Sequence, residues 1–65
     1  MSHHLQLKRK IIMDFIYKRI KESGAKDASH INMHKLENLV MWNYGATRET
    51  ARKLIDITVE VMPFD

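Results

Sequence analysis

The residues best suited to bind an anion follow Gly45, about two thirds of the way along the chain. The segment GATRETARK, residues 45–53, places two hydroxyl and three cationic side chains close together: Thr47, Arg48, Thr50, Arg52 and Lys53. Threonine hydroxyls donate to phosphate oxygens, and an arginine can donate two parallel hydrogen bonds to a phosphate or to a guanine edge. Carboxylates that would repel an anion lie in this segment, at Glu49, and shortly after it, at Asp56 and Glu60. The segment therefore also fits a mixed-charge helix face that is simply exposed to water.

The pattern around these residues predicts a helix over residues 47–61. Its inward positions recur at spacings of three and four, at Ala51, Leu54, Ile55, Thr58 and Met62. Thr47 can cap the first turn, and Pro63 prevents the helix from continuing. The alternation in ITVEVM is also compatible with a strand, so residues 57–64 are left open between helix and strand.

A long helix is predicted over residues 5–23. One face carries an apolar stripe, widened by Ile11 and Met13, that consists of Leu5, Ile12, Phe15, Ile16 and Ile20. Gly24 is expected to end this helix, because glycine readily adopts the left-handed conformation that closes a helix.

A shorter helix is predicted over residues 33–43, after a polar connector. Asn32 is a good N-cap, and Ile31 and Leu36 have the spacing of a hydrophobic staple. The face expected to point inward contains Leu36, Leu39, Val40 and Asn43. Gly45 would permit a sharp corner before the third helix.

The segment GATRETARKLID resembles the turn and recognition helix of the helix-turn-helix and winged-helix transcription-factor superfamily. That pattern is glycine, a small apolar residue, Ser or Thr, two variable residues, Thr, a small apolar residue and a basic residue. It is filled in order by Gly45, Ala46, Thr47, Thr50, Ala51 and Arg52, with Leu54 at the later buried position. The resemblance is close over the last part of the chain, and the first two helices agree in order and length. The small, cysteine-free chain, rich in Ile and Lys, also resembles archaeal or archaeal-virus proteins.

The resemblance implies an all-α fold, a three-helix helix-turn-helix bundle formed by a single domain over residues 1–65. The alternative form of this fold is a truncated winged helix with a short extended tail at the C-terminus. Met41 stands where the family usually has a small residue, and only VEVMPFD follows the third helix, so we expect no wing. The implied partner is double-stranded DNA, in transcription or in the nucleoid, bound through the residues of the opening segment: Thr47, Arg48, Thr50, Arg52 and Lys53.

Composition excludes several other classes of protein. The chain has no cysteine, so disulfides and thiolate metal sites are impossible, and it has no run of about 20 apolar residues. Because the chain has neither such a run nor the pattern of a signal peptide, we expect a cytoplasmic protein. We expect neither an enzyme nor a cofactor, because the sequence contains no nucleophile–base or phosphate-loop pattern. His30 and His34 are four apart, but no third metal ligand accompanies them.

A second hypothesis is a non-catalytic accessory subunit. The net charge is +3, with +5 in residues 1–26 and −2 in residues 27–65, so the basic surface belongs to the first helix. Such a protein would dock on a larger nucleic-acid-processing complex, for example an archaeal DNA polymerase or transcription assembly. The apolar stripe exceeds what one small core needs, so we expect a homodimer or a larger protein partner, contacted through Leu5, Ile12, Phe15, Ile16, Tyr17 and Trp42.

Overall fold

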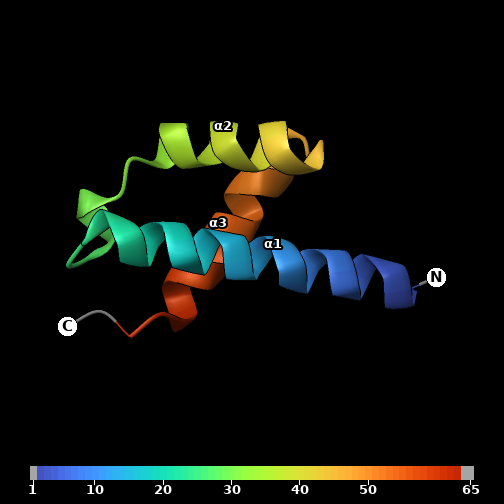
Figure 1. The fold of residues 1–65 in the computed structure, drawn as a ribbon, viewed down its shortest axis with the longest axis horizontal. Coiled ribbons are helices and arrows are strands. Elements are labelled where there is room, and N and C mark those ends of the chain that lie inside the picture. The colour runs from blue at the N-terminus through green and yellow to red at the C-terminus, as the bar shows by residue number, and fades with distance from the viewer. Residues whose placement is uncertain (1, 64–65) are drawn as a thin grey trace.

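The protein is an all-α bundle of three helices (Figure 1). The computed structural model describes the backbone of residues 2–63 and the side chains of residues 8–63. Helix α1 spans Ser2–Ser23, α2 spans Met33–Tyr44 and α3 spans Arg48–Val61, and a short 3-10 helix, η1, occupies Ala28–His30. Within residues 2–63 no strand occurs, so residues 57–61 are helical and the alternative of a strand there is wrong.

The predicted helix ends lie within one residue of the observed ones, except that α1 begins at Ser2 and not at residue 5. The ends agree where the capping residues were identified correctly. The Asn32 side chain accepts a hydrogen bond from the Lys35 amide, and the Thr47 side chain accepts one from the Thr50 amide. Thr47 is thus the cap of α3 and not its first helical residue. Gly24 and Gly45 both have positive φ, 73° and 67°, the conformation expected of glycines that end helices.

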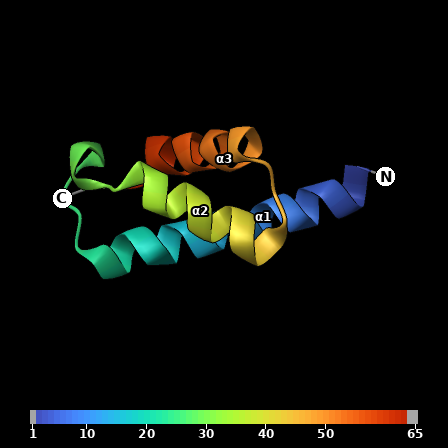
Figure 2. The same ribbon diagram turned by 90° about the horizontal axis from the view of Figure 1, so that it is seen from above.

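Helices α1 and α2 run antiparallel, and α3 crosses both of them (Figures 1 and 2). Figure 2 shows α3 as a separate layer above α1, with α2 between them in the view. Helix α1 is the longest, and its N-terminal end extends beyond the other two helices. Residues 45–47 form the connection between α2 and α3, so the first turn of α3 lies directly after the corner.

The core lies where the three helices meet. It consists of Ile12, Ile16 and Ile20 from α1, Leu36 and Val40 from α2, and Ala51, Leu54 and Ile55 from α3, closed by Met62 after the last helix. Thr58 is also buried, and its hydroxyl donates to the Leu54 carbonyl oxygen over 2.8 Å. The inward face predicted for α3 is therefore confirmed at every position.

The predicted inward face of α2 needs one correction. Leu36 and Val40 are buried and Leu39 is half-buried, but Asn43 is exposed, and its amide donates back to the Leu39 carbonyl oxygen over 2.8 Å. An exposed backbone carbonyl thus satisfies Asn43, which would have had no partner inside an apolar core. None of the described helices is both long and apolar enough to cross a membrane.

Candidate functional site

A buried carboxylate joins the two arginines that the sequence singled out. Glu37, on α2, is only 6% exposed. Its Oε1 accepts a hydrogen bond from Arg48 Nη1 over 2.7 Å, and its Oε2 lies 3.3 Å from Arg52 Nη1. Arg48 and Arg52 are one turn apart at the start of α3, so both reach the same carboxylate across the interface between α2 and α3. We call these three residues the Glu37 cluster.

Further contacts hold each guanidinium in place. Arg48 Nη2 donates to Asn38 Oδ1 over 2.9 Å, and Arg52 Nε donates to Asp56 Oδ1 over 3.1 Å. His34 Nδ1 lies 3.5 Å from Arg48 Nη1. The arginine side chains are nevertheless 47% and 52% exposed, so part of each guanidinium faces solvent. The cluster therefore presents two oriented but largely neutralised cations at the first turns of α3.

The arginines favour the charged form of the carboxylate they surround. The hydrogen bond from Arg48 is the largest influence and lowers the pKa of Glu37; burial opposes it, and the Arg52 hydrogen bond adds to the lowering. Asp56 and then Glu37 raise the pKa of Arg52. Both pKa shifts favour the charged forms of Glu37 and Arg52.

This shift predicts a stability that depends on pH. Because the folded-state pKa of Glu37 lies below its unfolded value, its contribution is complete above the unfolded value and is lost as the pH falls through the folded one. We expect the free energy of unfolding to decrease below about pH 4. The Glu37→Gln variant should lose part of that dependence in urea titrations between about pH 3 and pH 7. If the stability of this variant depended on pH as that of the unmodified protein does, the lowered pKa of Glu37 would be contradicted. Part of the pH dependence should remain in the variant, because a hydrogen bond from Ser29 also lowers the pKa of Asp27.

The two threonines predicted to contact phosphate are bonded to each other. Thr47 Oγ1 and Thr50 Oγ1 lie 3.0 Å apart, and the Thr50 amide donates to Thr47 Oγ1 over 3.2 Å. Both residues are exposed. Thr47 therefore caps α3, and Thr50 is bonded to it through both its amide and its hydroxyl.

Lys53 belongs to a different side of α3 from the arginines. It lines a groove of about 440 Å³ between α3 and α1, together with Lys8, Arg9, Ile12, Ala46, Thr50 and Leu54. No carboxylate lines this groove, and among the described residues none of the ion pairs involves its three cations. Helix α3 thus has cations on both flanks, Arg48 and Arg52 toward α2 and Lys53 with the α1 cations toward α1. Glu49 and Glu60 lie on the exposed ridge between the flanks, and Asp56 belongs to the arginine flank, where it accepts from Arg52.

The six residues predicted as an interface do not form one surface. Ile12 and Ile16 are buried in the core of a single chain, which corrects their assignment to an intermolecular contact. Phe15 and Tyr17 are half-buried, and the two lie on different sides of α1 because they are two residues apart. The side chain of Leu5 lies outside the described residues.

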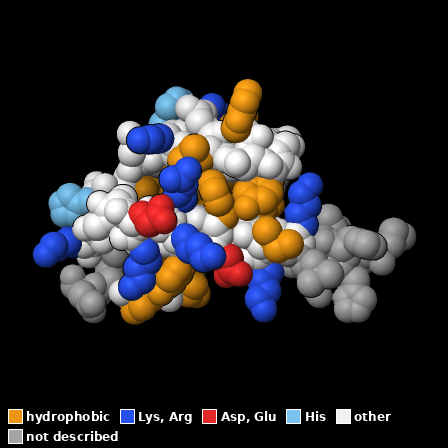
Figure 3. Space-filling model, in the orientation of Figure 1, with side chains coloured by type: hydrophobic (Ala, Val, Ile, Leu, Met, Phe, Trp, Pro, Cys, Tyr) orange, Lys and Arg blue, Asp and Glu red, His pale blue; other side chains and the backbone are white. Residues whose placement is uncertain are grey.

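Among the described members of this set, Trp42 is the one that is mostly exposed, with 88% of its surface accessible to solvent. The aromatic residue of α2 that contacts α1 is Tyr44, whose ring packs edge-on against the Phe15 ring with centroids 5.4 Å apart. The Arg19 guanidinium lies over the Phe15 ring, 5.4 Å from the ring centroid. Figure 3 shows hydrophobic side chains gathered over α1 and α2 on this face, with Lys and Arg side chains around them.

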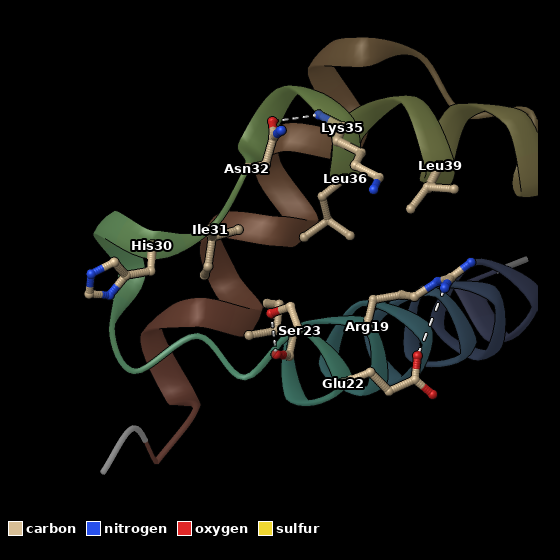
Figure 4. Close-up of a pocket in the computed structure, with 10 residues that line it drawn as sticks. Arg19, Glu22, Ser23, His30, Ile31, Asn32, Lys35, Leu36 and Leu39 are labelled. Atoms are coloured by element: carbon tan, nitrogen blue, oxygen red, sulfur yellow. Dashed lines mark hydrogen bonds and ion pairs between the residues drawn. The ribbon is translucent and has the colours of Figure 1, made fainter.

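A second groove, of about 390 Å³, lies between the end of α1 and the start of α2 (Figure 4). Leu36 and Leu39 line its apolar part, and Arg19 and Lys35 stand on opposite sides of it. Arg19 is paired with Glu22 over 3.8 Å, and His30 with Asp27 over 3.2 Å. His30 and His34 therefore contact different partners, and the described residues include no group of three metal-binding side chains.

Comparison of the chain with protein-family models, with curated proteins and with solved structures finds no match. The site must therefore be interpreted from its own geometry. Sequence reasoning missed Glu37, although one signal was present. Glu37 directly follows Leu36 and lies three residues before Val40, so it borders the buried stripe of α2, while two arginines begin the next helix.

Proposed function

We propose that this protein is a small, non-catalytic DNA-binding module of the helix-turn-helix type, in which the first turns of α3 face the duplex. The observation that supports it best is the pair of cationic flanks on either side of α3. A helix that enters the major groove has a phosphate backbone on each side of it. The cations of the groove beside α1 match one of these backbones, whereas Arg48 and Arg52, which are paired with Glu37, suit contact with base edges.

The flank toward α1 supplies the phosphate contacts. Lys8, Arg9 and Lys53 surround one groove without a carboxylate, so their charges are not neutralised by a neighbouring acid there. Thr50 lies in the same groove, beside the first backbone amides of α3. Free cations and helix N-terminal amides are the groups that fix a protein on the phosphate backbone.

The flank toward α2 and the exposed ridge supply groups that can distinguish bases. Arg48 and Arg52 are oriented by their contacts, and arginine is suited to the O6 and N7 acceptors of guanine. Glu49 lies on the ridge between the flanks and can accept a hydrogen bond from the N4 amino group of cytosine. The ridge carboxylates repel phosphate, so this face favours contact with base edges over contact with the backbone.

Titration of the protein with short duplexes at several salt concentrations tests the proposal. We expect the logarithm of the binding constant to fall steeply with the logarithm of salt, with a slope of about −0.9 for each phosphate contacted. A binding curve that is absent at about 50 mM salt, or insensitive to salt up to about 200 mM, would contradict DNA binding. The emission of Trp42, the single tryptophan, can be recorded in the same titration.

The exposure of Trp42 favours a second candidate, docking on a larger protein as an accessory subunit. Tryptophan is enriched in interface hot spots, and the Trp42 side chain is exposed to solvent. A shift of its emission to shorter wavelength on addition of a partner, without any change on addition of DNA, would support docking. The same shift produced by concentrating the chain alone would assign this surface to a second copy.

A further inference from the structure

We infer that Glu37 sets the selectivity of the candidate DNA site, by acting as an internal anion that orients Arg48 and Arg52 and neutralises part of their charge. This inference rests on the proposed function. Two half-exposed guanidiniums share one buried carboxylate, and each has a second partner besides it. Such an arrangement has two separate physical consequences.

The first consequence is weaker attraction to phosphate of any sequence. Phosphate contact strengthens binding mainly by releasing condensed counterions, and this needs a net positive charge on the protein surface. The Glu37 cluster and Asp56 together contain two cations and two anions, so this flank has no net charge. A phosphate that approaches Arg48 or Arg52 also meets the repulsion of the carboxylates already bound there.

The second consequence is fixed geometry. Arginine loses considerable side-chain entropy when it is ordered, and a guanidinium held in place before binding does not lose it again on binding. Arg48 is held through both Nη atoms, and Arg52 through Nε and Nη1. Their remaining N–H groups therefore point in defined directions, which favours a base edge at one position and disfavours acceptors placed elsewhere.

The Glu37→Gln variant separates this role from a merely structural one. It preserves the shape of the side chain and removes its charge. We expect its affinity for duplexes of arbitrary sequence to rise about tenfold at low salt, and its salt slope to steepen by about one to two phosphate contacts. Its preference for the best duplex, selected from a random library with the unmodified protein, should fall about tenfold.

Asp56→Asn is the matched control. It removes the same charge from the same flank and also frees a contact of Arg52, but it leaves Arg48 and Arg52 on Glu37. A general effect of net charge would make the two variants equal, whereas the inference requires a clearly larger change in Glu37→Gln. Adding Arg48→Ala to Glu37→Gln should abolish most of the gain.

Arg48→Lys tests the inference independently in case Glu37→Gln does not fold. It keeps the net charge but cannot donate in parallel to Glu37 and Asn38. We expect reduced selectivity with an unchanged salt slope. If Glu37→Gln and Arg48→Lys both fold, and both bind every duplex as the unmodified protein does, the inference is wrong while DNA binding stands. If the unmodified protein binds no duplex, the proposed function itself fails.

Discussion

The Leu54→Asp variant is expected to be unfolded at room temperature. Leu54 is buried between α3 and the other helices, and it also lies under the groove formed with α1. Removing its side chain alone should cost about 2–5 kcal/mol, and a buried carboxylate without a partner adds to that cost. A single core in a chain of this size rarely supplies more than about 3–5 kcal/mol. The loss therefore exceeds the available stability.

Far-ultraviolet circular dichroism measured against temperature provides the test. The variant should show little helical signal and no cooperative melting. Lys53→Asp is the control, because it introduces the same side chain at the neighbouring, exposed position of the same helix. A cooperative melt of Leu54→Asp near that of the unmodified protein would mean that the inward face of α3 is assigned incorrectly.

The variant with both Lys8→Glu and Lys53→Glu is expected to bind duplex DNA at least about a hundredfold more weakly at low salt. These two lysines line the same groove from α1 and α3, and no described ion pair involves them. Each reversal removes one phosphate contact and adds one repulsion. Both positions are exposed, so the melting temperature should change little.

A matched variant with Lys21→Glu and Lys26→Glu changes the net charge by the same amount at the opposite end of the bundle. Lys21 and Lys26 line a separate depression near Met62 and Pro63, away from the first turn of α3. Equal losses of affinity in the two double variants would show that only overall charge matters, and the location of the DNA site would then be wrong.

The sequence by itself determined the fold class and the helix ends. The caps Asn32 and Thr47 and the two glycines act through neighbouring residues, and the apolar positions of α3 repeat with the period of a helix, so these signals are sufficient to locate the helices. The burial of Leu54 and Thr58 follows from the same periodicity. Local interactions of this kind are fully encoded within a window of a few residues.

Only the tertiary structure decided what the candidate site residues contact. The sequence indicates Arg48 and Arg52 as candidate DNA contacts, but Glu37 is eleven and fifteen residues away from them and meets them only when α2 and α3 pack together. The packing of α2 on α1 brings Tyr44 against Phe15 and leaves Trp42 exposed to solvent. Lys8 and Lys53 share a groove for the same reason. Helical periodicity indicates which face of each helix is buried, but the charges that neutralise or accompany one another depend on how the helices cross.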